Sequence, residues 1–390
     1  MKFEYSSLCD LKESKQLGTI LCQSFGTPNS FWQDYVNNIG PENFRILRQN
    51  GEIIGGLAIY PMAQWYGGLR VPMAGIAAVG IAPEYRGKGA ANRLMDYLIE
   101  ELKDSKFSIS VLYPATQRLY QKIGYERAGS YCIWEIPIAN INTDNYRLSI
   151  SRVDPQEYQV FENIYCQQAQ NNNGNLERHS SIWKRITERS EDREVYAYLL
   201  GDLSEPEGYI IFTQEREKEE KIIKVRDKSL LTTAAIQDFW SFLAAHRSMF
   251  KKACWKSSPL DPLSLFLPEQ KAKIHHQEYW MLRIIDVASA LMQRGYPLGI
   301  ETELHLEVKD EQIHPNNSKF CLQVSQGKAE VIKGGKGEFK IDIKSLSCLY
   351  SGLFNPAQIK LIGHLDATFK ALSTANLLFS SPVPWMADFF

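Results

Sequence analysis

The most informative part of the sequence is the stretch Val79-Gly80-Ile81-Ala82-Pro83-Glu84-Tyr85-Arg86-Gly87-Lys88-Gly89-Ala90-Ala91. The apolar run that leads into it, Gly75–Ile81, predicts a buried strand, and Pro83 ends that strand. After the loop, small and apolar residues return with helical spacing, at Ala91, Leu94, Met95, Leu98 and Leu102. The stretch therefore predicts a strand, a basic glycine-rich loop and an amphipathic helix, in that order.

The composition of this loop is typical of a pyrophosphate site. The pattern R-x-x-G-x-A, from Arg86 to Ala91, offers small residues whose backbone N–H groups can approach phosphate oxygens. The helix start adds a partial positive charge, and Arg86 and Lys88 add full ones. An ordinary strand–turn–helix connection is the alternative, and the order of strand, proline, basic loop and helix favours the phosphate site over it.

The sequence around this stretch alternates strands and helices. Asn50-Gly51 predicts a tight hairpin turn. Downstream we expect a strand at 107–112, a helix at 116–123 that Gly124 caps, and a strand at 131–136 that closes the first domain. Polar residues at 139–145 predict a linker, which gives a first domain over residues 1–145.

Two further domains are predicted. Residues 146–283 repeat the order of strands, helix and strand, but Arg-Asp-Lys-Ser-Leu-Leu replaces the phosphate loop after Val225. Residues 284–390 carry four further strands, helical stretches and an abrupt apolar end. The fold class that follows is a mixed α/β, or α+β, chain.

Composition excludes several classes of function. The formal net charge of the 390 residues is −1, whereas nucleic-acid binders usually present a basic face. The seven cysteines are scattered without CxxC spacing, so neither a metal site nor a disulfide framework is predicted. The charged N-terminus does not resemble a signal peptide, and no stretch reaches the length of a membrane span. We therefore expect a cytoplasmic protein with no nucleic-acid or membrane partner.

Two motifs together resemble those of the GNAT acetyltransferases. The first is VGIAPEYRGKGAANRLM, from Val79, and the second is ATQRLYQKIGY, from Ala115 to Tyr125. The resemblance implies acetyl-CoA as cosubstrate. It assigns Val79, Gly80 and Ile81 to the thioester end, Arg86, Gly87, Lys88, Gly89, Ala90, Ala91 and Asn92 to the pyrophosphate, and Ala115 and Thr116 to the far wall of the groove.

The whole chain resembles the Eis-type (enhanced intracellular survival) N-acetyltransferases more narrowly. The run MLRIIDVASALMQRGYP resembles the entry into that family's C-terminal domain, and SSPVPWMADFF resembles its terminus. The resemblance implies a GNAT domain, a degenerate GNAT-like domain at 146–283 and a sterol-carrier-protein-like domain at 284–390. It further implies a homohexamer and an amine acceptor such as an aminoglycoside, a polyamine or a lysine side chain.

Two residues are predicted to move protons. Tyr120 matches the motif tyrosine and is the candidate general acid, since a phenol stays protonated at neutral pH; Tyr125 is its competitor, and packing is the other reading of either. The resemblance assigns the base to the terminal carboxylate of Phe390, which the apolar chain end would bury. Asp388 is a rival proton acceptor, although a solvated surface charge is the role we expect for it.

Two alternatives stay open at this point. The C-terminal domain could make the protein a carrier of lipids or other hydrophobic ligands, because fold alone does not fix function. The aromatic residues Phe31, Trp32 and Tyr35 could belong to the core or, if exposed, favour a cationic amine.

Overall fold

The computed structural model describes residues 2–143, 145–189 and 193–390. These residues form two compact units, each described here by itself. Met1–Ala128, Trp280–Ser381 and Phe390 form the first, and Gly129–Tyr279 with Pro382–Phe389 form the second. Asp144, inside the predicted linker, lies outside the described residues.

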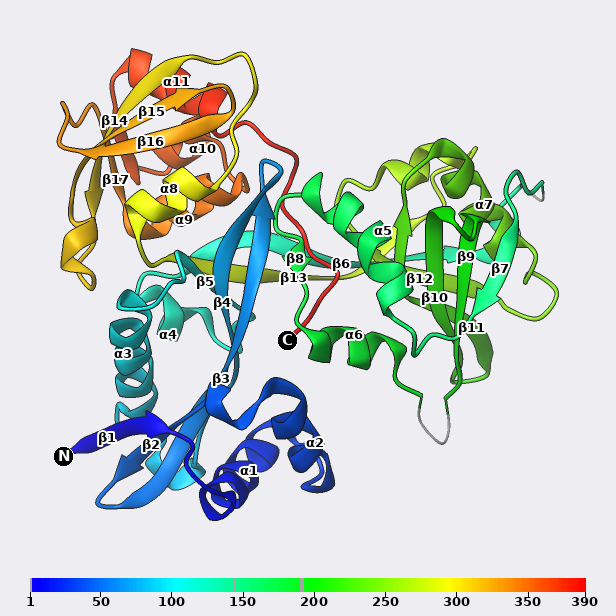
Figure 1. Ribbon diagram of the computed structural model, residues 1–390, viewed down its shortest axis with the longest axis horizontal. Coiled ribbons are helices and arrows are strands. Elements are labelled where there is room, and N and C mark those ends of the chain that lie inside the picture. Colours follow the sequence, from blue (N-terminus) through cyan, green and yellow to red (C-terminus); the bar gives the residue numbers. More distant parts are fainter. Residues whose placement is uncertain (1, 144, 190–192) are drawn as a thin grey trace. The chain divides into compact units, whose positions relative to one another are not determined.

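The N-terminal part of the first unit is a mixed sheet with helices. Its strands follow the order β1-β2-β3-β4-β5-β13, in which β4 and β5 are parallel and the other neighbours antiparallel. The elements are β1 (Phe3–Ser7), α1 (Leu11–Phe25), α2 (Ser30–Ile39), β2 (Phe44–Gln49), β3 (Glu52–Tyr66), β4 (Leu69–Ile81), α3 (Ala90–Lys103), β5 (Ile109–Leu112), α4 (Gln117–Gln121), β6 (Glu126–Pro137) and β13 (Lys273–Ile284). The long β3–β4 hairpin can be followed in blue in Figure 1.

Local sequence explains one hairpin turn and one helix of this part of the fold. Asn50 and Gly51 both have positive φ, 52° and 82°, as a two-residue hairpin between β2 and β3 requires. Helix α3 buries Leu94, Met95 and Leu98 in a core that it shares with β3, β4 and β5. Both elements were predicted, and burial of the apolar helix face holds α3 against the sheet.

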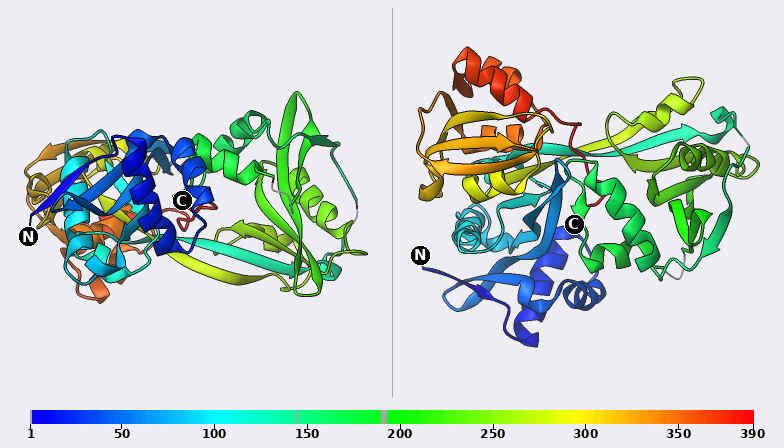
Figure 2. Two further views of the ribbon diagram at one scale, coloured as in Figure 1. Left: turned by 90° about the horizontal axis from the view of Figure 1, so that it is seen from below. Right: turned by 45° about the horizontal axis from the view of Figure 1, so that its top comes forward.

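The tail of the chain adds a second sheet to the first unit. Its strand order is β16-β15-β14-β17-β18, with β14 and β17 parallel. The elements are α8 (Val287–Gln293), β14 (Thr302–Lys309), β15 (Ser318–Ser325), β16 (Lys328–Lys333), β17 (Phe339–Asp342), α9 (Ile343–Ser351), α10 (Pro356–Leu361), β18 (Leu365–Ala367) and α11 (Phe369–Leu378). Figure 2 shows this sheet in yellow and orange, with the helices of the chain end beside it in red.

The second unit repeats the topology of the first. Its strand order is β7-β9-β10-β11-β12-β6, and β11 and β12 are again parallel, with a helix between them. The elements are β7 (Ile150–Val153), α5 (Gln159–Gln170), β8 (Leu176–Glu177), α6 (Ser180–Thr187), β9 (Val195–Asp202), β10 (Glu205–Glu217), β11 (Glu220–Leu230), α7 (Thr233–Ala244) and β12 (Lys252–Ser257). Aromatic side chains of α7 and β12 build its core, with Phe239, Trp240 and Trp255 fully buried.

Two predictions about the chain after the first motifs differ from the structure. Strand β6 does not close the first unit, because it runs through Ala128 into the second. The segment predicted as a linker, 139–145, is partly core: Ile141 is buried beside the aromatic residues of the second unit, as is Ile138 just before the segment. Polar neighbours concealed the apolar Ile141. Among the described residues, no helix is long and apolar enough to cross a membrane.

Candidate active site

The free edge of β4 lies where the thioester end was predicted. Strand β4 pairs with β5 only from Met73 to Ile76, yet it continues to Ile81. On its other side a bulge opposite Leu57 interrupts the pairing with β3, and Ala78 there has a φ of 51°. Val79, Gly80 and Ile81 therefore lie beyond the last pair with β5. Ala78 itself was not predicted, because no sequence signal marks an alanine in the left-handed region.

The loop after β4 has the geometry of an anion site. Gly87 and Gly89 have φ of 74° and 84°, and a Cβ at either position would meet no atom within 4 Å. Gly89 is the N-cap of α3 and supplies no side chain to its first turn. Ala90 begins the helix, and the half-buried Ala91 and Asn92 follow. The first N–H groups of this 14-residue helix have no side-chain cap, and a helix start of this kind favours an anion.

The two basic side chains of the loop also fix its shape. Arg86 donates from Nε to the carbonyl of Ile81 at 2.9 Å and from Nη2 to Ser24 Oγ at 3.0 Å. Lys88 donates to the carbonyl of Glu84 at 2.8 Å. Arg86 therefore ties the loop to the end of β4, which joins the two halves of the predicted cofactor site.

Tyr120 and Tyr125 differ in their hydrogen bonding. Burial raises the pKa of Tyr120 to about 12, and its hydroxyl has no hydrogen-bond partner among the described residues. Tyr125 is fully buried, and its hydroxyl lies 2.7 Å from Ser110 Oγ. Because the Ser110 hydroxyl donates its own proton to the carbonyl of Ala74, Tyr125 is the donor to Ser110. Burial raises the pKa of Tyr125 as well. Of the two phenols, Tyr120 is the one with a free hydroxyl.

The segment before Tyr120 is exposed. Ala115 and Thr116 lie between β5 and α4, and Thr116 is the N-cap of that helix without a side-chain hydrogen bond to it. Helix α4 has only five residues, so its position depends on packing rather than on its own length. Both residues are therefore accessible beside the β4–β5 edge, on the side from which α4 begins.

The terminal residue packs into the first unit. Phe390 is 8% exposed, and its ring lies 5.8 Å from the ring of Tyr60 and 5.9 Å from that of Tyr113. A Cβ on Gly75 would lie 2.8 Å from Phe390 Cε2, so only glycine leaves room for this ring on β4. These three neighbours were not predicted, because nothing local in the sequence relates them to the chain end.

Phe390 and Tyr120 approach the β4–β5 edge from opposite faces of the sheet. Phe390 lies over Gly75 and its cross-strand partner Tyr60. Ile76, the next residue of β4, points to the other face and belongs to the core cluster that contains Tyr120. The two predicted proton-transfer residues thus flank the point at which β4 loses its pairing with β5.

Asp388 is not the solvated surface charge that we expected. It is 2% exposed, and its carboxylate accepts from Arg178 Nε at 3.0 Å. Arg178 also makes a bidentate pair with Asp227 and lies over the ring of Tyr165 at 3.6 Å. Burial opposes ionisation of Asp227, but Arg178 outweighs it and lowers the pKa of that carboxyl. Sequence reasoning failed because the arginine that neutralises Asp388 is 210 positions away.

Of the N-terminal aromatic residues Phe31, Trp32 and Tyr35, one lies in the core and one is exposed. Trp32 is buried and donates to Ser14 Oγ at 3.1 Å, so it is a core residue. Phe31 is 51% exposed and stacks on Tyr35 with ring centroids 5.6 Å apart. An exposed pair of this kind can contact a cationic ligand.

One group among the described residues has the composition of a metal site. Ligand atoms of Glu303, His305 and Cys321 lie within 4.8 Å of one another on β14 and β15. His305 Nε2 lies 3.0 Å from the Glu303 carboxylate, and its Nδ1 accepts from the backbone N–H of Lys336 at 3.4 Å. The Nε2 atom therefore carries the proton and donates to Glu303, which satisfies the imidazole without a metal.

Family models match three parts of the chain. Residues 9–128 and 174–284 each match an acetyltransferase (GNAT) domain, and residues 287–387 match a sterol carrier protein domain. These matches confirm the mixed α+β class with two GNAT domains and a sterol-carrier-like tail.

Whole-length relatives agree with this domain order. A crystal structure of a GCN5-related N-acetyltransferase from Anabaena variabilis is 50% identical, covers 100% of both chains and superimposes with a TM-score of 0.98. N-acetyltransferase Eis from Mycobacterium tuberculosis is 25% identical over 92% of this chain and 91% of its own. The structure of Eis1 from Mycobacterium abscessus shares the fold, with a TM-score of 0.84 at 19% identity over 100% of both chains. The chain therefore belongs to the GCN5-related N-acetyltransferase (GNAT) family, as an Eis-like member with two GNAT domains and a C-terminal sterol carrier protein domain.

Proposed function

We propose that this N-acetyltransferase moves an acetyl group from acetyl-CoA to a primary amine, by direct attack in a ternary complex. The amine belongs to an aminoglycoside, a polyamine or a lysine side chain. One observation carries the proposal. At the β4–β5 edge, the Phe390 ring lies over Gly75 on one face of the sheet, and Tyr120 packs on the opposite face.

The donor is held along β4 and the loop that follows. The thioester end lies along Val79 to Ile81, where backbone groups are beyond the pairing with β5. The pyrophosphate lies over Gly87 and Gly89 at the start of α3, beside Lys88. A helix N-terminus and a cation both favour phosphate oxygens, and the open space above the glycines admits them.

Each proton in the reaction has a named partner. The amine nitrogen attacks the thioester carbonyl, a C–N bond forms and the C–S bond breaks. The ammonium proton passes to the carboxylate of Phe390, and the CoA thiolate takes the proton of Tyr120. Because burial raises the pKa of Tyr120 to about 12, this phenol keeps its proton through the neutral range.

The terminal carboxylate is a base whose strength depends on its surroundings. A free α-carboxyl has a pKa of about 3.3–3.7 and is a weak proton acceptor in water. Phe390 is buried with its ring beside Tyr60 and Tyr113, and we propose that its carboxylate is partly desolvated with it. Desolvation favours the neutral form of a carboxyl group and so strengthens it as a base.

A panel of amine acceptors tests the reaction class. Purified enzyme with acetyl-CoA is given a polyamine, an aminoglycoside and a lysine-containing peptide, and release of free thiol is followed. We expect acceptor-dependent thiol release above the hydrolysis seen without acceptor. A carrier of hydrophobic ligands would instead bind lipid and release no CoA, and that result would contradict the proposal.

We further propose that the enzyme is a cytoplasmic homohexamer, as the resemblance to Eis-type enzymes implies. Light scattering across a wide range of protein concentration tests the assembly. A mass of six chains supports the hexamer, whereas monomer at every concentration contradicts it.

A further inference from the structure

A buried ion pair joins the GNAT domain of the first unit to its sterol-carrier-like tail. Arg283 on β13 is fully buried, and its Nη2 atom donates to both carboxylate oxygens of Asp310, at 2.8 and 2.7 Å. Asp310 directly follows β14 of the tail. A charge buried this deeply is stable only when it is paired and hydrogen-bonded.

The guanidinium also holds the turn that carries Tyr120. Arg283 Nε donates to the carbonyl of Ile123 at 2.9 Å. In that turn the backbone N–H groups of Ile123 and Tyr125 both donate to the carbonyl of Tyr120, at 3.1 Å each. Gly124 has a φ of 92°, and a Cβ there would lie 2.6 Å from Arg283 Nε. The glycine of the second motif is thus what lets the arginine lie against the turn.

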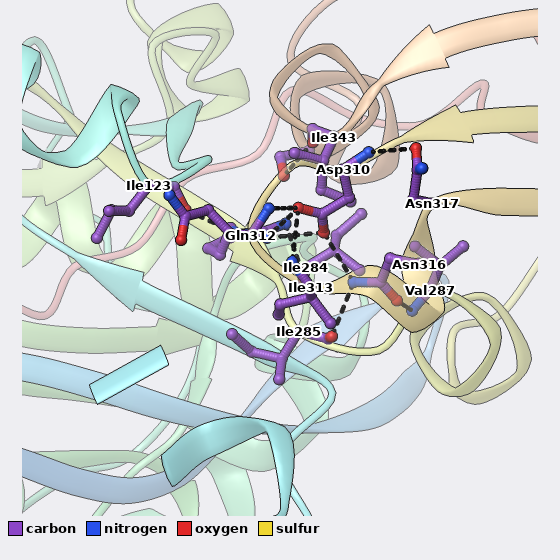
Figure 3. Close-up of polar contacts among 12 residues, drawn as sticks. Ile123, Ile284, Ile285, Val287, Asp310, Gln312, Ile313, Asn316, Asn317 and Ile343 are labelled. Atoms are coloured by element: carbon purple, nitrogen blue, oxygen red, sulfur yellow. Dashed lines mark hydrogen bonds and ion pairs between the residues drawn. The ribbon is translucent and has the colours of Figure 1, made fainter. Parts of the chain in front are cut away.

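Asp310 is itself held rigidly. Figure 3 shows its carboxylate between Gln312, Ile313 and Asn316, whose N–H groups donate to it at 3.0, 3.1 and 3.0 Å. Asn316 in turn donates to the carbonyl of Ile285 at 2.9 Å. Every oxygen of this carboxylate is occupied, so the arginine has a fixed anchor on the tail.

We propose that Arg283 and Asp310 are positioning residues for Tyr120. This inference rests on the proposed role of Tyr120 as the proton donor. The Tyr120 hydroxyl has no hydrogen bond of its own among the described residues, so packing and the backbone of its turn decide where it points. The remaining hydrogen bond of Arg283 goes to the carbonyl of Ile284, on the same strand β13. Within the GNAT domain, the turn that carries Tyr120 is therefore the segment outside β13 that Arg283 holds. The tail thereby contributes to catalysis at the second motif as well as at the chain terminus.

A double-mutant cycle tests the inference. Wild type, Tyr120→Phe, Asp310→Asn and the double variant are compared for kcat, for the acetyl-CoA KM and for thermal midpoint. A displacement on the order of 1 Å can cost about 10²-fold in rate, so we expect Asp310→Asn to lower kcat about tenfold to a hundredfold with little change in KM. In the Tyr120→Phe background the same substitution should cause almost no further loss.

A matched variant separates positioning from stability. Glu101→Gln breaks another ion pair of the first unit, that with Arg45 at 2.5 Å, near the last turn of α3. It should lower the thermal midpoint and leave kcat unchanged. If Asp310→Asn does the same, or if its loss in kcat adds fully to that of Tyr120→Phe, the pair is merely structural.

The other outcomes are also decisive. A normal kcat in Tyr120→Phe overturns the proposed proton donor rather than the pair. If Asp310→Asn does not fold, Arg283→Lys takes its place in the cycle. It keeps a cation opposite Asp310, but a single ammonium cannot also reproduce the planar fork toward Ile123. A wild-type kcat in folded Arg283→Lys overturns the inference.

Discussion

The two GNAT domains use the same topology around two different helix starts. In the first, α3 connects the paired parallel strands β4 and β5; in the second, α7 connects the paired parallel strands β11 and β12. The strand that precedes each helix contains a bulge. In β4 the bulge lies opposite Leu57, and in β11 it lies at Arg226. The backbone plan of a cofactor groove is therefore present twice.

The two helix starts differ in one residue that matters. Gly89 precedes α3 and offers no side chain, whereas Thr232 precedes α7 and its Oγ1 accepts from the N–H of Ala235 at 3.1 Å. The second helix satisfies one of its first N–H groups internally. An anion at the first helix start meets unsatisfied donors, and at the second it would compete with a hydroxyl.

The strands before these helices differ in the same sense. Beyond its pairing with β5, β4 carries the small or apolar Val79, Gly80 and Ile81. The matching part of β11 carries Asp227, which is buried and paired with Arg178. An anionic donor molecule would meet a buried carboxylate there. The same fold therefore supports both helix starts, and a few local residues decide whether a phosphate can bind there.

The largest effect is expected at Tyr120. Tyr120→Phe removes the proposed proton donor and should lower kcat about 10²–10⁴-fold with little effect on the acetyl-CoA KM. Tyr125→Phe is the matched control, because that phenol is engaged with Ser110; it should cost stability and leave kcat nearly unchanged. Since the pKa of Tyr120 is about 12, wild-type kcat should not fall through loss of this proton between pH 7 and about 10. Equal kcat in both variants would remove Tyr120 from the mechanism.

The next effect concerns the chain terminus. Adding one glycine after Phe390 keeps the ring and moves the carboxylate by up to about 3.3–3.6 Å. Amidation removes the charge without changing length. Each should lower kcat/KM for an amine by about 10²-fold while acetyl-CoA still binds. Near-wild-type activity of the amidated protein would mean that another group accepts the proton.

Asp388→Asn is the control for the terminus. Asp388 is bound by Arg178, so this substitution should lower the thermal midpoint more than it changes the pH dependence of kcat/KM. A loss as large as that of the amidated protein, with a shifted pH profile, would restore Asp388 as the proton acceptor.

A smaller effect is expected at the helix start itself. Gly89→Val puts a β-branched residue at a φ of 84°, where strain costs about 1–3 kcal/mol and the loop must shift. Since about 1.4 kcal/mol corresponds to a tenfold change in affinity, the acetyl-CoA KM should rise about tenfold to a hundredfold. Gly363→Val carries the same backbone cost at a φ of 79° in the tail and should leave that KM unchanged. An unchanged KM in Gly89→Val would contradict the assignment of the pyrophosphate.

The smallest effect is expected in the second domain. Thr232→Ala removes the cap of α7 and should lower the free energy of unfolding by about 1 kcal/mol, measured by denaturant or heat. Because we assign no phosphate to this helix start, the acetyl-CoA KM should stay at its wild-type value. A raised KM would show that the second domain takes part in binding acetyl-CoA.

Features that depend on residues close together in the sequence could be predicted from it. The φ angles of Asn50, Gly51, Gly87 and Gly89 follow from the residues, and the apolar period of α3 follows from burial of one helix face. The first family motif lies within these local features, which is why the donor loop could be predicted from it.

Contacts between residues far apart in the sequence became visible in the folded chain alone. Arg283 reaches the turn of Tyr120 across 160 positions, Asp388 finds Arg178 across 210, and the Phe390 ring occupies the space that Gly75 leaves. No local pattern distinguishes a solvated aspartate from a buried one. The free energy of burying a charge depends on whether a partner lies opposite it, and the folded chain alone supplies that partner.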